Sequence, residues 1–204
     1  MIILQELVWP ASWEEASIVA RHLTDRLGCP IDDGILEMVV ALNLLGLRTC
    51  QSCEGHLEEG HPYPWVNLET DEFPAFKQAL EDASREELSS EEQEAKGAHL
   101  VAIVEKLPSR GVVYTRLEAL LHDYHLQRHS SLECPPIALH WFSPIFFRIL
   151  PSCAYGADEW PVHERASNLA HAQAEMRAFT AFLKQRFFES EQREPVGAME
   201  TALV

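Results

Sequence analysis

The chain has 204 residues, of which 47% are hydrophobic and 24% are charged, a composition typical of a globular protein with one buried core. Its formal net charge of −16 disfavours nucleic acid as a partner, because most of the surface repels phosphate groups. No apolar run reaches the length of a membrane span and the first residues do not resemble a signal peptide, so we expect a cytoplasmic protein without a membrane segment.

Two helices are predicted near the start of the chain. Ser12 begins a capping box, and apolar residues at helical spacing follow it as far as Gly28. Asp32 or Asp33 can cap a second helix that is apolar around nearly its whole circumference and ends at Gly46. A helix of this kind belongs in the core.

Strands are predicted in two regions. Residues 47–49 form a short strand that leads into a polar turn, and residues 65–69 alternate as a half-buried strand. Farther along, residues 137–142 and 145–150 are apolar runs separated by Ser-Pro, which predicts a hairpin or two edge strands.

Three further helices are expected, at about residues 98–107, 112–127 and 162–189. The acidic segment 81–96 carries seven acidic residues and two basic ones, so it predicts a solvated helix edge or a mobile connection, and as an alternative an acidic docking surface for a protein partner.

These elements predict a single α+β domain with a small sheet and about five helices. We place that domain at residues 1–190 and a flexible tail at 191–204, because the helical pattern fades near the C-terminus and no second-domain boundary is visible.

The candidate site is the segment Thr49–His56, which we expect to be a tight turn after a buried helix and a short strand. Cys53 can act there as a nucleophile or acid whose ionisation is set by His56, since a nearby imidazolium favours the thiolate. Ser52 supplies a hydroxyl and Glu54 a carboxylate. The plainer interpretation is a capped turn in which Cys53 is a small buried residue.

Four residues are candidates for ligand binding: Thr49, Gly55, Trp65 and Arg148. Thr49 offers a hydroxyl, Gly55 permits a backbone with positive φ, and Trp65 can stack on a planar ligand or pack in the core. Arg148 interrupts an apolar strand, so it either points to solvent by alternation or lies inward as an anchor for an anionic group beside the motif.

A metal site is the alternative interpretation of the same motif. Cys50, Cys53 and His56 form a Cys-x2-Cys-x2-His cluster that suits zinc. Candidates for the fourth ligand are His61, Cys153, Cys134 and His99. A redox Cys-x-x-Cys pair is a third interpretation, disfavoured because the motif does not open a helix.

The segment Leu42–His56 followed by Pro62–Val66 carries the pattern LN-x-LG-x-x-T-x-x-SC-x-GH and then PYPWV. Over roughly residues 30 to 70 it resembles an uncharacterised bacterial protein family. In that pattern the position of Cys50 need not be cysteine, so the resemblance implies that Cys53 and His56 are the important pair. The shorter T-x-x-SC-x-G is similar to the methyltransferase-like third protein of wybutosine synthesis, a family that uses S-adenosylmethionine on tRNA.

Three functions therefore remain open. The first is a small-molecule enzyme or ligand-binding protein with its pocket at Thr49–His56. The second is a zinc-stabilised interaction protein that uses Cys50, Cys53 and His56. The third is an acidic protein that binds and inhibits a nucleic-acid-handling partner.

Overall fold

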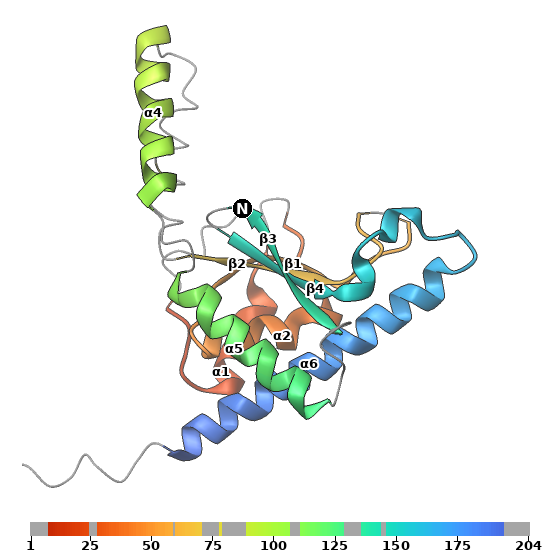
Figure 1. Cartoon of the computed structure of the whole chain (residues 1–204). Helices are drawn as coiled ribbons and strands as arrows, with labels where there is room; N and C mark the ends of the chain where they lie inside the picture. The colour runs from red at the N-terminus through yellow and green to blue at the C-terminus, as the bar shows by residue number, and fades with distance from the viewer. Residues whose placement is uncertain are drawn as a thin grey trace, which may run out of the picture.

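The computed structural model describes residues 8–24, 28–58, 60–70, 78, 89–106, 111–128, 136–143 and 146–193. Within these residues, five α-helices and one four-stranded antiparallel sheet form a single α+β arrangement, which confirms the predicted fold class (Figure 1). Four of the helices lie together on one side of the sheet, whereas one stands away from the rest of the molecule (Figure 1). None of the described helices is both long and apolar enough to cross a membrane.

Helix α1 (Trp13–His22) begins at the predicted cap. The Ser12 side chain accepts a hydrogen bond of 3.3 Å from the backbone N–H of Glu15, which satisfies one of the unpaired donors of the first turn. The helix ends at His22 and not at Gly28 as predicted, because Leu23 adopts an extended backbone conformation and stops the helical hydrogen bonds.

Helix α2 (Asp33–Leu44) is almost entirely buried, as its apolar circumference predicts. Asp32 is its N-cap residue, but its side chain makes no capping hydrogen bond. At the other end, Asn43 is buried and its Nδ2 donates to the Thr49 hydroxyl at 2.8 Å, while Thr49 N donates to Asn43 Oδ1 at 3.3 Å. This pair ties the end of α2 to the first strand, with Gly46 at φ +72° making the turn between them.

The sheet has the strand order β1-β2-β4-β3, and all neighbours are antiparallel. The strands are β1 (Thr49–Cys53), β2 (Trp65–Glu69), β3 (Ile137–Ser143) and β4 (Phe146–Pro151). Strand β2 has its predicted bounds, and β3 and β4 form the predicted hairpin. Strand β1 begins at Thr49 and contains a bulge before Gln51, so the expected strand at residues 47–49 is wrong in its bounds.

The two faces of the sheet differ sharply in chemistry. The inner face, which packs on the helices, carries from the two central strands Val66, Leu68, Phe147 and Ile149. The outer face carries Gln51, Cys53, Trp65, Asn67, His140 and Arg148, as the cross-strand pairing shows. Strand alternation places these two sets on opposite sides of the same four strands.

Helices α5 (Val112–Gln127) and α6 (Arg165–Arg193) complete the core with α2. Tyr124 of α5 packs its ring 4.9 Å from that of Phe179 on α6, centroid to centroid. Helix α5 has the predicted bounds, whereas α6 starts and ends about one turn later than the expected 162–189. The predicted tail from 191 is therefore still helical as far as Arg193, and residues 194–204 lie outside the described part of the chain.

Helix α4 (Ser90–Lys106) is the one that stands away from the body (Figure 1). It starts earlier than the expected 98–107 because Ser89 and Glu92 form a capping box, in which the Ser89 hydroxyl accepts from Glu92 N at 3.3 Å and Glu92 Oε2 accepts from Ser89 N at 2.9 Å. The second half of the acidic segment is thus an exposed helix, and residues 81–88 lie outside the described range.

Candidate functional site

The Thr49–His56 segment is a strand followed by a loop, and not the tight turn that the sequence suggested. Residues 49–53 pair with β2, with Cys53 directly opposite Trp65, and the chain leaves the sheet at Glu54. Polar residues can occupy this strand because some of the β1 side chains lie on the polar outer face of the sheet. Thr49 and Ser52 lie on the inner side, opposite Leu68 and Val66.

Three side chains converge where β1 ends. Asp32, Cys53 and His56 each offer one ligand atom, and these atoms all lie within 4.8 Å of one another. Asp32 Oδ2 lies 3.5 Å from His56 Nε2. The His56 side chain is 45% exposed and that of Asp32 is 31% exposed, so the cluster opens to solvent. We call this set the Asp-Cys-His cluster.

Asp32 joins the cluster because its carboxylate is not used as a helix cap. Asp32 Oδ2 instead accepts a hydrogen bond of 3.0 Å from the backbone N–H of Glu54. In return, Glu54 Oε2 accepts from the backbone N–H of Gly34 at 2.7 Å, in the first turn of α2. This exchange fastens the loop after β1 to the start of α2 and holds the Asp32 carboxylate beside Cys53 and His56.

Two glycines permit this close approach. Gly55 has φ +86°, and a Cβ there would lie 2.7 Å from both Leu169 Cδ1 and the Tyr63 carbonyl carbon. A Cβ on Gly34 would run into the Glu54 carboxylate. From α6, Gln173 Nε2 also donates to the Glu54 carbonyl at 3.1 Å, so the loop is held on several sides. Gly55 therefore shapes the backbone of the site, in line with the positive φ that we expected.

The thiol of Cys53 is not activated in the way that the sequence suggested. Burial raises its pKa, and the Asp32 and Glu54 carboxylates raise it further, while the N–H of Gly55, 3.3 Å from Sγ, and the Arg148 charge lower it by less. The net shift is upward, so the thiol is protonated near neutral pH. A cation bound between these groups would reverse this balance, because it favours the thiolate and both carboxylates.

Cys50 lies apart from the cluster. It sits at the bulge of β1, where its Sγ donates to the carbonyl of Asn67 at 3.7 Å. Burial raises its pKa to about 12, and the nearby Glu69 carboxylate adds to the shift. The expected zinc set of Cys50, Cys53 and His56 is thus replaced by a set in which Asp32 takes the place of Cys50.

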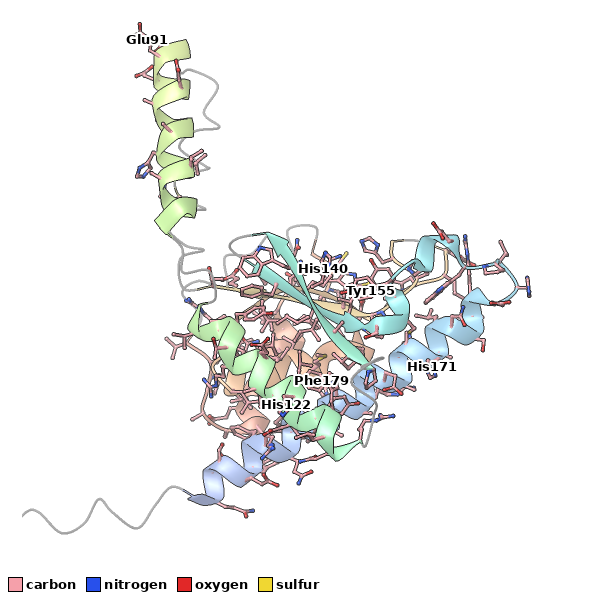
Figure 2. The ribbon with its side chains drawn as sticks, in the orientation of Figure 1. Glu91, His122, His140, Tyr155, His171 and Phe179 are labelled. Atoms are coloured by element: carbon pink, nitrogen blue, oxygen red, sulfur yellow. The ribbon has the colours of Figure 1, made fainter. Side chains whose placement is uncertain are left out.

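Arg148 lies on the outer face of the sheet, on the side away from the helices, but its side chain is buried and not in solvent. It is only 9% exposed, its Nε donates to Asn67 Oδ1 at 2.9 Å, and its guanidinium lies 4.2 Å from the centroid of the Trp65 ring. Asn67 Nδ2 in turn donates to Gln51 Oε1 at 3.2 Å. A polar row therefore crosses the sheet beside Cys53, with Trp65 next to it. On the next strand His140 lies opposite Arg148, and its ring lies near that of Tyr155 (Figure 2).

The other candidates are placed as follows. His61 accepts a backbone hydrogen bond from His56 N at 3.0 Å through its carbonyl, and its ring packs on Tyr63 and Trp65. His99 is on the distant helix α4, and Cys153 is exposed after β4. Cys134 lies outside the described residues. Sequence reasoning missed Asp32 as a member of the cluster, because its position before a helix marks it only as a cap.

Comparison of the chain with known protein families, with curated proteins and with solved structures found no match. The family resemblance inferred from the motif therefore stays a prediction, and the geometry of the site is the basis for a proposed function.

Proposed function

We propose that this protein binds a divalent transition metal ion, with zinc the best fit, through Asp32, Cys53 and His56. The observation that carries the proposal is the convergence of a carboxylate, a thiol and an imidazole within 4.8 Å of one another. Zinc takes this mixture of oxygen, sulfur and nitrogen ligands at about 2.0–2.3 Å, which places its ligand atoms roughly 3.3–3.8 Å apart in a tetrahedron. The separation of 3.5 Å between Asp32 Oδ2 and His56 Nε2 is already in this range.

The cluster supplies three protein ligands, which leaves one position of a tetrahedral ion for water or for a small molecule. Zinc sites that act on substrates have this composition, whereas purely structural sites usually have four protein ligands. The partial exposure of His56 and Asp32 gives a ligand access from solvent. We therefore favour a site for a small molecule over a zinc-stabilised interaction protein.

Arg148 supports an anionic group on that small molecule. The Arg148 charge lowers the pKa of the Cys53 thiol, although burial and the nearby carboxylates raise it by more. Its position over Trp65, the residue directly opposite Cys53, places a cation and an aromatic ring beside the cluster. A small molecule with an acidic group can thus meet the metal through one end and this cationic side through the other.

A metal-free function of Cys53 as nucleophile has less support. It requires a thiolate, and burial together with Asp32 and Glu54 raises the pKa of Cys53. The Cys53 thiol and the Asp32 and Glu54 carboxylates together favour a bound cation. The surroundings that oppose Cys53 as a nucleophile therefore support it as a metal ligand.

The test is the metal content of untagged, anaerobically purified protein, measured by mass spectrometry of the elements. We expect close to one zinc ion per chain in the wild type, and loss of that ion in Cys53→Ser and in Asp32→Asn. The matched control is Cys50→Ser, which removes a thiol from the same strand outside the cluster and should keep the ion.

Reconstitution separates weak binding from none. Added zinc should raise the melting temperature of the wild type, by the equivalent of about 2.7 kcal/mol at a free concentration of 100 Kd, and leave that of Cys53→Ser unchanged. The proposal fails if zinc stabilises both proteins equally, or if Cys50→Ser loses the metal and Asp32→Asn keeps it.

A further inference from the structure

Three aromatic side chains, those of His61, Tyr63 and Trp65, lie together next to the Asp-Cys-His cluster. The His61 ring lies 5.1 Å from the Tyr63 ring and 6.1 Å from the Trp65 ring, centroid to centroid, so the three form one continuous group. We call this group the aromatic wall. None of the three belongs to the apolar core that the described residues form, and contiguous apolar groups outside a core often mark a binding site.

The aromatic wall meets the cluster at two points. Trp65 pairs with Cys53 across β1 and β2, and residues directly opposite each other in antiparallel strands have Cβ atoms about 4.5–5.5 Å apart. In the loop, the backbone N–H of His56 donates to the carbonyl of His61 at 3.0 Å, so the segments that carry these two histidines run side by side. A small molecule bound to a metal ion in the cluster therefore lies within reach of the wall.

Gly55 brings Tyr63 close to the cluster. Because Gly55 lacks a Cβ, its backbone approaches the carbonyl carbon of Tyr63, which lies 2.7 Å from where a Cβ would stand. Tyr63 is thus held beside the segment between Cys53 and His56, and the close packing at Gly55 positions the wall as well as the metal ligands.

Two of the three rings are open to a ligand. His61 is exposed and Tyr63 is half-buried, so both side chains reach the surface. The Trp65 ring has the Arg148 guanidinium 4.2 Å from its centroid, so one of its faces is already covered. A ligand would therefore contact mainly His61 and Tyr63, with Trp65 and Arg148 behind them.

We propose that the small molecule bound at the Asp-Cys-His cluster carries a flat aromatic ring, which packs against His61 and Tyr63. The ligand class rests on the proposed metal site and narrows it from a small molecule with an acidic group to an aromatic acid. Aromatic pairs with centroids about 4.5–7 Å apart attract each other beyond the effect of apolar burial. His61 and Tyr63 then determine specificity without holding the metal ion.

The test compares two zinc-binding compounds of similar size, benzohydroxamate and cyclohexanecarbohydroxamate. Both bind zinc through the same group, and only the first has an aromatic ring, whereas the second is the more apolar. Titration calorimetry of the zinc-loaded full chain measures the Kd of each. We expect benzohydroxamate to bind roughly threefold to tenfold more tightly, which apolar burial alone does not produce.

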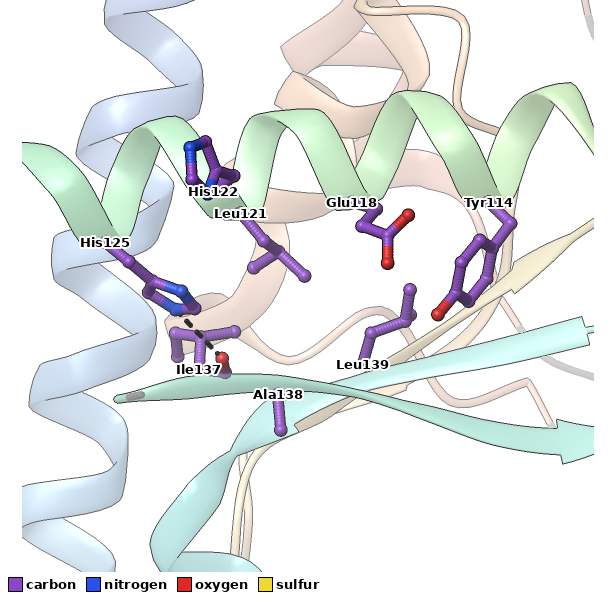
Figure 3. A pocket seen from close by; sticks show the side chains of 8 residues that line it. All are labelled: Tyr114, Glu118, Leu121, His122, His125, Ile137, Ala138 and Leu139. Atoms are coloured by element: carbon purple, nitrogen blue, oxygen red, sulfur yellow. Dashed lines mark hydrogen bonds between the residues drawn. The ribbon is translucent and has the colours of Figure 1, made fainter. Parts of the chain in front are cut away.

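Two variants assign this preference to the aromatic wall. Tyr63→Leu keeps an apolar side chain, and His61→Ala changes an exposed position where folding is least at risk. Each should keep the zinc ion and reduce the preference to about twofold or less. The matched control is Tyr114→Leu, since Tyr114 lines a groove between α5 and β3, at the opposite edge of the sheet from β1 (Figure 3). It should keep the full preference.

The outcomes separate the aromatic ligand from the metal site. A chain that takes up no zinc contradicts both. A zinc-loaded chain that binds neither compound, binds the two equally, or keeps its preference in both Tyr63→Leu and His61→Ala overturns the aromatic ligand and leaves the metal site standing. Cys53→Ser, which loses the zinc ion, should bind neither compound, and tight binding of benzohydroxamate by this variant would also overturn the proposal.

Discussion

The two faces of strands β2 and β4 differ in what holds them in place. On the inner face, Leu68 pairs with Phe147 across the strands, and both are buried against the helices. On the outer face, Asn67 pairs with Arg148, and the contacts are a directed hydrogen bond of 2.9 Å and a guanidinium over Trp65. Successive residues of one strand thus belong to an apolar core and to a polar row.

The inner face therefore contributes mainly to the stability of the fold, whereas the outer face carries the polar groups near the Asp-Cys-His cluster. Apolar burial on the inner face is non-directional and roughly proportional to area, so it stabilises the fold without defining a site. The outer face holds polar groups at fixed distances beside the Asp-Cys-His cluster, where each group needs its partner. Substitutions on the inner face should therefore change the free energy of unfolding, and those in the polar row of the outer face should also change the binding of the proposed small molecule, though not of the metal ion.

The largest effect is expected on the inner face. Leu68→Ala leaves a cavity in a fully buried position and should lower the free energy of unfolding by about 2–5 kcal/mol, as measured by urea denaturation. Zinc content per folded chain should stay unchanged. The control is Gln51→Ala on the exposed side of β1, which loses one hydrogen bond to Asn67 and should cost about 1 kcal/mol or less. Similar costs for the two variants would remove the distinction between the faces.

The next effect is expected in the loop that joins the outer face to α2. Gly55→Ala forces a Cβ against Leu169 and Tyr63 at positive φ, and should cost about 2–3 kcal/mol. Because the loop carries His56, zinc affinity should fall together with stability. Gly60→Ala is the matched control, since Gly60 also has positive φ but has no atom within 4 Å of an added Cβ. If Gly60→Ala is as damaging as Gly55→Ala, close packing at Gly55 is not the cause.

A smaller effect is expected in the polar row. Arg148→Met keeps much of the side-chain volume but leaves Asn67 Oδ1 without its donor, and should cost about 1–3 kcal/mol. Zinc content should persist, because Arg148 is not a ligand in the proposed site. Arg177→Met, at an exposed position of α6, should change stability by less than about 0.5 kcal/mol. Loss of zinc from folded Arg148→Met would contradict this prediction, because it would mean that the metal site depends on the polar row.

The smallest effect concerns reactivity without a change in stability. The pKa of Cys50 is raised to about 12, so only about one thiol in ten thousand is ionised at pH 8, and its alkylation by iodoacetamide should be very slow. Exposed Cys29 and Cys153 should react first, as followed by fragment mass spectrometry. A higher pH should speed the reaction of Cys50, because the thiolate forms only as the pH approaches the raised pKa. Fast labelling of Cys50 at pH 8 would contradict its buried position.

Much of the fold was predictable because the local patterns are strong. The periodicity of residues 112–127 and the alternation of 65–69 gave α5 and β2 their observed bounds, and two apolar runs gave the hairpin of β3 and β4. The end of α1 was missed because Leu23 turns the chain without a glycine or proline at that position. Strand β1 was misplaced because its polar residues resemble a turn until β2 pairs with them.

The sequence alone singled out Cys53 and His56 as candidates, since reactive side chains concentrate in one short motif. Only the tertiary structure brought in Asp32, whose carboxylate is drawn from the cap of α2 to the N–H of Glu54 across the fold. The same holds for Arg148, because alternation cannot tell which face of a sheet is covered. Local patterns encode helices and strands, whereas a binding site depends on distances between segments that are set when the core packs.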